Sequence, residues 1–146
     1  MAVKKIISLL GGTGDLGTGL ASRLLNSGYK VIIGSRTLEK AKRAEQSLGS
    51  NVEGMINKDA ASQGEIIILT VPFAHQRSIV EECKLEIRGK LFIDTTVPLM
   101  PPKVATVQLP EAGSAAQISQ NILGDEVRVV SAFQNISAEL LQGNHK

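Results

Sequence analysis

The sequence predicts a doubly wound α/β fold, in which helices cover both faces of a mainly parallel sheet. Five short runs rich in Val, Ile and Leu recur along the chain, and each is too short for a helix but fits a buried strand. These runs cover residues 3–10, 31–33, 66–71, 91–93 and 127–130. Helical patterns alternate with them, and this alternation requires right-handed crossovers between parallel strands. The order is typical of a Rossmann-type sheet, and a chain of 146 residues suits one domain spanning 1–146.

The helical patterns lie between these strands. Residues 16–25 place Leu16, Leu20 and Leu24 on one face, and Gly28 follows shortly after. This pattern is typical of an amphipathic helix with a glycine stop. Residues 38–48 form a second such pattern, and 78–85 and 115–123 are two further expected helices. The segment 98–110 holds four of the five prolines, so we expect a loop there, at the edge of the sheet where α/β proteins bind ligands.

A glycine motif follows the first expected strand and opens the first helix. Its sequence matches G-x-G-x-x-G and reads Gly12-Thr13-Gly14-Asp15-Leu16-Gly17. In this setting the motif predicts dinucleotide binding. We expect Gly12 to allow a tight turn, Gly14 to let the backbone approach a pyrophosphate, and Gly17 to let the helix pack on the strands. The helix N-terminus then offers N–H groups to the phosphates, whereas the alternative is a glycine turn without a ligand.

The end of the second expected strand indicates which dinucleotide binds. NAD-specific domains place an acidic residue there, but this chain has Gly34-Ser35-Arg36, with Lys40 one helical turn further on. A hydroxyl, a guanidinium and an amine suit a 2′-phosphate, so NADP(H) is favoured over NAD. The alternative is a solvated basic helix face, which we expect for Lys42 and Arg43.

Composition excludes several other functions. The net charge is +2 and aromatic residues make up 3% of the chain, which favours neither nucleic-acid nor membrane binding. Residues 1–50 carry eight basic and three acidic side chains, so an anionic ligand should favour this part. The single cysteine, Cys83, excludes an internal disulfide and a cysteine-based zinc site, and it fits a cytoplasmic protein without a metal.

Few residues suggest acid–base or nucleophilic chemistry. His75 follows Pro72 near the expected crevice and is a weak catalytic candidate, although a surface or helix-capping role is the plainer interpretation. We expect Cys83 to be a packed side chain and Asp94 to orient a loop or cap a strand end. The only tyrosine, Tyr29, has no lysine at position 33, which excludes the Tyr-x-x-x-Lys chemistry of short-chain dehydrogenases.

Taken together, several segments resemble the NADPH-dependent coenzyme F-420 reductases over nearly the whole chain. The segments are Gly11-Gly12-Thr13-Gly14-Asp15-Leu16-Gly17, Ile33-Gly34-Ser35-Arg36 with Lys40, Thr70-Val71-Pro72, Asp94-Thr95-Thr96-Val97-Pro98-Leu99 and Val130-Ser131-Ala132-Phe133-Gln134-Asn135-Ile136. The resemblance implies reversible hydride transfer between NADP(H) and a deazaflavin, coenzyme F-420. The related ferric-reductase domains of membrane metalloreductases use flavin, so a flavin acceptor stays open.

The resemblance also implies roles for individual residues. It implies that residues 13–16 bind the pyrophosphate, and that Ser35, Arg36 and Lys40 bind the 2′-phosphate. Val71 and Pro72 would lie on the ribose and nicotinamide side, with Val97 and Ala132 bordering the nicotinamide. Hydride transfer between stacked rings depends on positioning rather than on an acid or base, so no catalytic side chain is required.

The resemblance further concerns the C-terminal part. Members of that family continue past the segment matching residues 133–141 into a helical region that forms a dimer and closes the deazaflavin pocket, whereas this chain stops at Lys146. We therefore expect a homodimer or a partner subunit that supplies this region. The alternatives are a non-catalytic NADP(H)-binding or sensing module and the nucleotide-binding half of a longer reductase.

Overall fold

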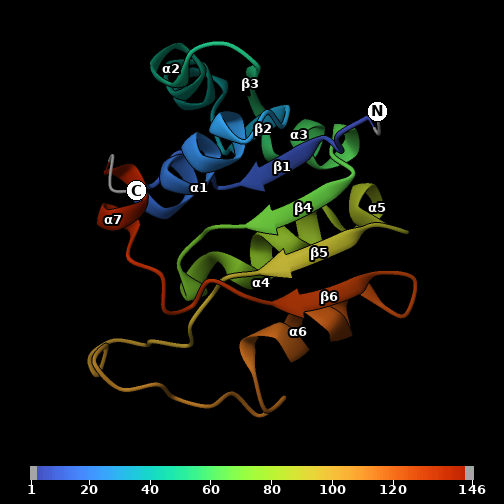
Figure 1. Ribbon diagram of the computed structural model, residues 1–146. Coiled ribbons are helices and arrows are strands. Elements are labelled where there is room, and N and C mark those ends of the chain that lie inside the picture. The colour runs from blue at the N-terminus through green and yellow to red at the C-terminus, as the bar shows by residue number, and fades with distance from the viewer. Residues whose placement is uncertain (1–2, 144–146) are drawn as a thin grey trace.

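A computed structural model describes residues 3–143 and contains one sheet of six parallel strands. The strands lie in the order β3-β2-β1-β4-β5-β6 (Figure 1). Their bounds are β1 Ile7–Leu10, β2 Val31–Ser35, β3 Val52–Ile56, β4 Ile66–Leu69, β5 Leu91–Asp94 and β6 Arg128–Ser131. The reversal of strand order beside β1 is the Rossmann arrangement, and such sheets bind ligands at the carboxyl ends of their strands. The predicted fold class is confirmed.

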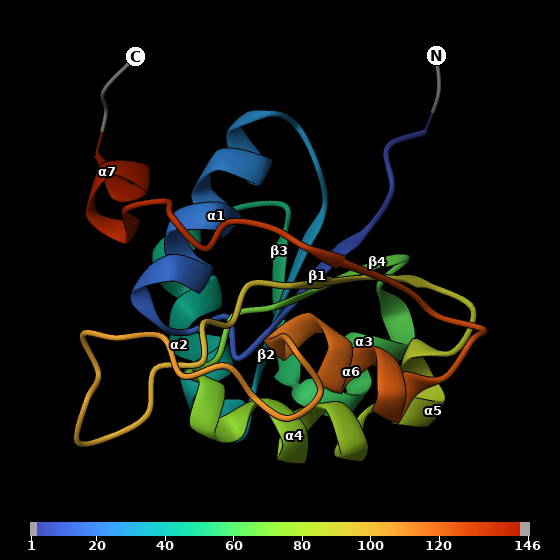
Figure 2. The same cartoon turned by 90° about the horizontal axis from the view of Figure 1, so that it is seen from below.

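Helices form a layer on each face of the sheet (Figures 1 and 2). One layer holds α1 Asp15–Asn26, α2 Leu38–Leu48 and α7 Ala138–Gln142, which pack around a core that includes Leu9, Leu20 and Ile33. The other layer holds α3 Asn57–Gln63, α4 Phe73–Glu82, α5 Lys84–Ile87 and α6 Ala115–Leu123. Its core contains Phe92 and Ile67, both fully buried. In the described residues, no helix is long and apolar enough to cross a membrane.

Most predicted helices and strands are present in the structure, but one helix begins earlier than expected and three elements were not predicted. The helices expected at 38–48 and 115–123 have the observed bounds. The helix expected at 78–85 was placed too late, because α4 begins at Phe73, directly after Pro72, and α5 follows it. The strand β3 and the helices α3 and α7 were not predicted. Gly54 interrupts the apolar pattern of β3, and a Cβ there would lie 2.3 Å from the Ala41 carbonyl oxygen, so α2 requires a glycine in this strand.

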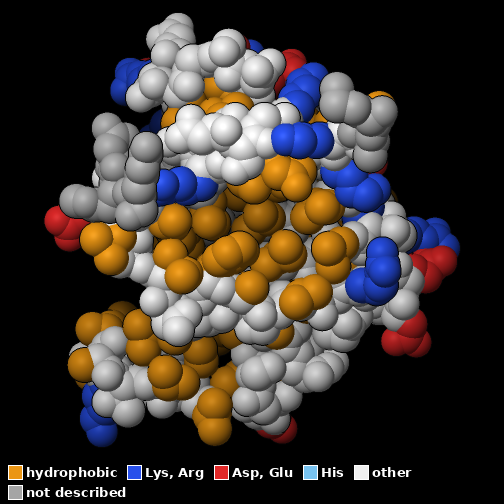
Figure 3. Space-filling model, in the orientation of Figure 1, with side chains coloured by type: hydrophobic (Ala, Val, Ile, Leu, Met, Phe, Trp, Pro, Cys, Tyr) orange, Lys and Arg blue, Asp and Glu red, His pale blue; other side chains and the backbone are white. Residues whose placement is uncertain are grey.

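Burial falls steadily along one row of paired residues on the α1 face of the sheet. The row runs through Ile33, Leu9, Ile68, Ile93 and Val130, which are neighbours in register. Ile33 and Leu9 are fully buried, Ile93 is half-buried, and Val130 is 44% exposed. Figure 3 shows hydrophobic side chains gathered over this uncovered part of the face. Helices α1, α2 and α7 therefore cover the β1–β3 side of this face, and the side of β5 and β6 is open.

A buried polar network fixes the carboxyl end of β5. The Asp94 carboxylate accepts hydrogen bonds from Gln76 Nε2 at 2.7 Å and Ser119 Oγ at 2.6 Å, and from both the backbone N–H and the hydroxyl of Thr96. These partners lie on α4, α6 and the loop that leaves β5. Because four donors satisfy the buried carboxylate, the network ties three elements together and orients that loop. Asp94 thus both orients a loop and caps a strand end.

The segment after β5 is a long surface loop. Residues 98–110 contain neither helix nor strand, apart from an isolated bridge between Leu99 and Val107. The loop extends away from the sheet in Figures 1 and 2. Its proline content predicted this absence of regular structure.

Candidate functional site

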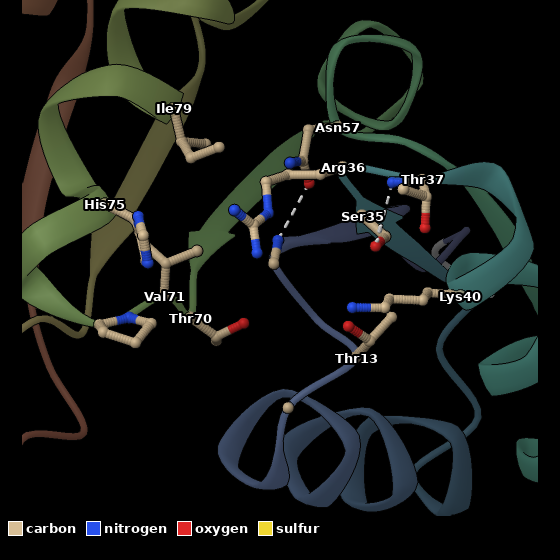
Figure 4. A pocket seen from close by; sticks show the side chains of 13 residues that line it. Thr13, Ser35, Arg36, Thr37, Lys40, Asn57, Thr70, Val71, His75 and Ile79 are labelled. Carbon is tan, nitrogen blue, oxygen red and sulfur yellow. Dashed lines mark hydrogen bonds between the residues drawn. The ribbon is translucent and has the colours of Figure 1, made fainter.

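A cavity of about 420 Å³ lies at the carboxyl edge of the sheet, beside the point where strand order reverses. The residues that line it follow the ends of β1, β2, β3 and β4 (Figure 4). They are Gly11, Thr13, Gly14, Ser35, Arg36, Thr37, Lys40, Asn57, Thr70, Val71, Pro72, His75 and Ile79. Four separate segments of the chain thus converge on one pocket, as expected for a ligand site in an open α/β sheet.

The turn after β1 depends on glycine at position 11. Gly11 has a φ of +67°, and a Cβ there would lie 2.2 Å from Val71 Cγ1. The tight turn that was expected at Gly12 therefore has its positive φ at the preceding residue, Gly11. Gly12 is needed for space instead, because a Cβ would lie 2.7 Å from the Leu9 carbonyl oxygen. Its N–H donates to the Gly34 carbonyl at 2.9 Å, which joins the glycine loop to the end of β2.

The N-terminus of α1 opens into the pocket. Gly14 caps this helix without a side-chain hydrogen bond, and a Cβ on Gly14 would meet no atom within 4 Å. The first N–H groups of a helix lack partners within the helix, so this end suits an anion. Gly17 has a different role, because its Cβ would lie 2.5 Å from Gly12 Cα. That close contact lets α1 pack directly on the glycine loop, whereas the sequence predicted packing of this helix on the strands.

The basic side chains after β2 divide into two groups. The first group, Arg36 and Lys40, consists of exposed side chains that line the pocket beside Ser35, which is buried at the end of β2. No acidic side chain lines this pocket, and within residues 3–143 neither Arg36 nor Lys40 forms an ion pair. In contrast, Lys42 pairs with Glu45 and Arg43 pairs with Glu39 on the surface of α2. Two cations therefore face the pocket without a neutralising partner, as an anionic ligand requires.

The end of β4 forms the opposite wall of the pocket. The Thr70 hydroxyl donates to the Leu10 carbonyl at 3.0 Å, which holds this strand end against β1. Val71 and Pro72 follow, and His75 lies in the first turn of α4, with its imidazole facing the pocket in Figure 4. This wall is mostly apolar, so it suits the flat face of a ring better than a charged group.

Six predicted site residues do not line the pocket. They are Gly12, Asp15, Leu16, Gly17, Val97 and Ala132. Leu16 packs against the core of the α1 layer, and Asp15 is exposed in the first turn of α1. Val97 and Ala132 are half-buried after β5 and β6. The Ala132 N–H donates to the Asp94 carbonyl at 3.2 Å, so Ala132 lies beside the end of β5, which the pocket does not reach.

Five residues that line the pocket were not among the predicted site residues, namely Gly11, Thr37, Asn57, Thr70 and Ile79. Asn57 is the most informative of them, because its side chain is only 2% exposed. Its Oδ1 accepts a hydrogen bond from the Gly11 N–H at 3.0 Å, and its Nδ2 is buried without a partner among residues 3–143. A sequence signal for Asn57 existed, since it directly follows a strand end, but β3 itself was not predicted.

Other candidate chemistry lies outside this site. Cys83 is fully buried, and burial raises the pKa of its thiol to about 12, so it is a packed side chain as predicted. Among the described residues, no group of three or more His, Cys, Asp or Glu side chains could hold a metal ion. The groups that the pocket itself offers are backbone N–H groups, the cations Arg36 and Lys40, hydroxyls and an apolar wall.

These features define the chain as a Rossmann-type domain with a pocket where the strand order of its sheet reverses. The model of the family described as NADP oxidoreductase, coenzyme F-420-dependent, matches residues 6–98, and the chain belongs to this family.

Two relatives are named F-420-dependent NADP reductase. The protein of Methanocaldococcus jannaschii is 39% identical over 148 residues, which cover 93% of this chain and 66% of the relative. The protein of Methanothermobacter marburgensis is 44% identical over 147 residues, which cover 92% and 65%. This chain thus spans just under two thirds of the length of either relative.

A solved structure has the same fold. It is that of a candidate F-420-dependent NADP reductase from Arthrobacter sp. FB24, which superposes with a TM-score of 0.80 at 21% identity. The superposition covers 94% of this chain and 66% of the other.

Proposed function

We propose that this chain is an NADP(H)-binding domain of an oxidoreductase that transfers hydride between NADP(H) and a deazaflavin, coenzyme F-420, or a flavin. The observation that carries the proposal is the pocket itself. It combines an open helix N-terminus at Gly14 with the unpaired cations Arg36 and Lys40, and it has no acidic lining residue. The names of the two archaeal relatives support the choice of acceptor.

The proposed roles follow the position of each group in the pocket. The backbone from Thr13 to Leu16, including Asp15, holds the pyrophosphate at the start of α1. Ser35, Arg36 and Lys40 hold the 2′-phosphate, because a guanidinium and an amine both complement its charge. Gly12 and Gly17 act by packing the loop against α1 rather than by touching the ligand.

The nicotinamide side of the site is assigned to the apolar wall. Val71 and Pro72 flank the nicotinamide ribose and ring, and Val97 and Ala132 border the ring from the ends of β5 and β6. When bound, NADPH supplies the hydride, and the chain contributes orientation and exclusion of water. No acid or base is needed, so His75 is assigned a contact to the cofactor rather than a proton transfer.

The open face of the sheet supports a further proposal about assembly. Leu91 and Ile93 are half-buried and Val130 is 44% exposed on this face, although they are apolar residues of sheet strands. Apolar patches of this kind are typical of protein contacts. We infer that a second copy of the chain or a partner subunit covers it. Light scattering with size-exclusion chromatography tests this inference, and a monomer at all concentrations without any partner contradicts it.

A coupled titration tests the proposed activity. NADPH is added to the purified chain, followed by coenzyme F-420 or flavin mononucleotide, and the absorbance of both cofactors is recorded. Oxidation of NADPH that depends on the acceptor and on the chain supports the reductase. Binding of NADPH without turnover supports a second candidate, a nucleotide-binding or sensing module. The observation that favours this second candidate is that the pocket stops short of Val97 and Ala132.

A further inference from the structure

Asn57 occupies the junction between the two phosphate-binding parts of the pocket. It is the first residue of α3, directly after β3, and its side chain is 2% exposed. On one side its Oδ1 accepts from the Gly11 N–H at 3.0 Å. On the other side it lies against the end of β2, since a Cβ on Gly34 would be 2.8 Å from the same oxygen. Asn57 thus lies between the glycine loop and the Ser35–Arg36 segment.

The other amide atom of Asn57 has no partner in the described residues. The Gly11 N–H is a donor and can bond only to the amide oxygen, which fixes the orientation of the amide group and leaves Nδ2 as the free end. A buried N–H donor without an acceptor costs folding free energy, and the few that occur in native proteins call for an explanation. Because Asn57 lines the pocket, a bound ligand can provide the missing acceptor.

We propose that Asn57 is a nucleotide-binding residue whose Nδ2 donates a hydrogen bond to an oxygen of the adenosine ribose. This inference rests on the proposed NADP(H) function. The ribose is the part of NADP that joins the pyrophosphate to the 2′-phosphate, and Asn57 lies between the sites assigned to those two groups. The same side chain therefore supports the glycine loop through Oδ1 and contacts the ligand through Nδ2.

The position of Arg36 links the proposed contact between Asn57 and the ribose to the binding of the 2′-phosphate. Figure 4 shows the Arg36 side chain extending past Asn57 into the pocket, with Lys40 and Thr13 lying on the other side of Ser35. Nδ2 itself has almost no exposed surface, so we expect a movement of the Arg36 guanidinium toward a bound 2′-phosphate to open the approach to it. The 2′-phosphate and the ribose contact then form together.

The test compares two substitutions at Asn57 by calorimetric titration of the full chain with NADPH and with 2′,5′-ADP, which contains only the adenosine end. Asn57→Ala removes the donor without adding charge, and we expect both ligands to bind about fivefold more weakly, the effect of one hydrogen bond. Asn57→Asp keeps an acceptor for the Gly11 N–H but adds a negative charge. Its loss should exceed tenfold for both ligands.

Two controls separate contact from structure. Asn121→Asp makes the same charge change on α6, where Asn121 is exposed and lies outside the pocket, and its affinities should match the original chain. The melting temperature of each variant without ligand measures the loss of the Gly11 hydrogen bond. Variants that bind both ligands as tightly as the original chain overturn the assignment of Asn57. A loss confined to NADPH also overturns it, because the contact then lies outside the adenosine end.

A measurement on the original chain does not depend on the stability of any variant. In ¹⁵N-labelled protein, the side-chain amide resonances of Asn57 should shift when 2′,5′-ADP binds, and the exchange of these protons with water should slow. Unchanged Asn57 resonances in a chain that binds 2′,5′-ADP contradict the ribose contact alone. A chain that binds neither NADPH nor 2′,5′-ADP overturns the proposed function and this inference together.

Discussion

The two halves of the sheet are built from similar strands but differ in what covers them. Every residue of β1 and β2 is buried, whereas three of the four residues of β6 are exposed. The paired row from Ile33 to Val130 carries only Ile and Leu with one Val, so hydrophobicity does not change along it. The difference lies entirely in the helices that pack above. The half with complete layers contains the proposed phosphate-binding parts of the pocket. In the open half, the ends of β5 and β6 are followed by Val97 and Ala132, which are proposed to border the nicotinamide.

Charge follows the same division. Residues 1–50 have a net charge of +5, and the remaining residues have a net charge of −3, from eight basic and eleven acidic side chains. Within the positive half, α2 neutralises two of its cations by ion pairs and leaves Arg36 and Lys40 for the pocket. The charge distribution should therefore attract an anionic nucleotide to the half that contains its proposed site.

The largest effect should come from truncating the buried end of the paired row, and the exposed end provides the comparison. Ile33→Ala removes side-chain atoms from a fully buried site, and we expect it to lower the free energy of unfolding by about 2–5 kcal/mol. Val130→Ala, at a site that is 44% exposed, should lower it by about 0.5 kcal/mol. Urea denaturation at low protein concentration measures both. A large loss for Val130→Ala would mean that its face is covered in solution, and repeating the experiment at several concentrations would identify a second copy as the cover.

A pair of glycine substitutions separates folding from ligand binding within the covered half. Gly17→Ala places a methyl group 2.5 Å from Gly12 Cα, and the overpacking should cost about 1–3 kcal/mol of stability. Gly14→Ala meets no atom within 4 Å and should change stability by less than about 1 kcal/mol. Its methyl group should nevertheless weaken NADPH binding, because it occupies the space proposed for the pyrophosphate. Thermal melting and NADPH titration of both variants provide the measurement. Unchanged NADPH affinity in Gly14→Ala would mean that the pyrophosphate does not bind beside Gly14.

The same two halves show what sequence reasoning can reach. Local patterns predicted α2 and α6 at their observed bounds. The glycine motif and the segment with Ser35, Arg36 and Lys40 predicted most of the residues that line the proposed phosphate-binding part of the pocket. The strand β3 was missed because Gly54 breaks its apolar pattern for a tertiary reason, the contact with Ala41. Asn57 was missed with it. Coverage of β6 was equally beyond reach, because it depends on elements packed above the strand rather than on the residues in it.

A third prediction concerns nucleotide specificity. Arg36→Ala should weaken NADPH binding by about tenfold to thirtyfold and leave NADH binding nearly unchanged, because only NADPH carries the 2′-phosphate. Arg128→Ala is the matched control, since Arg128 is an exposed arginine on β6 in the other half of the sheet. Fluorescence titration with both nucleotides measures the effect. An equal loss for NADPH and NADH in Arg36→Ala would rule out its assignment to the 2′-phosphate.

The smallest expected effect is a dependence of stability on pH. The hydrogen bond from Lys42 and the one from the Gly54 N–H lower the pKa of Glu45 below its ordinary value of 4.5. Because the folded pKa lies below the unfolded one, this stabilisation is complete at neutral pH and is lost as the pH falls through the folded pKa. Glu45→Gln should therefore lower the melting temperature by about 1–2 °C at pH 7 and should match the original chain well below pH 4.5.

Glu126 provides the comparison from the other half. A hydrogen bond from Arg88 lowers its pKa as well, but both side chains are mostly exposed and Glu126 accepts no backbone N–H that would join two elements. Glu126→Gln should therefore change the melting temperature less than Glu45→Gln, whose site connects α2 to β3. Melting curves of both variants from pH 3 to pH 7 make the comparison. A larger effect at Glu126 would mean that a surface ion pair beside β6 contributes more to stability than a link within the covered half, and that the open half is more tightly held than its exposure indicates.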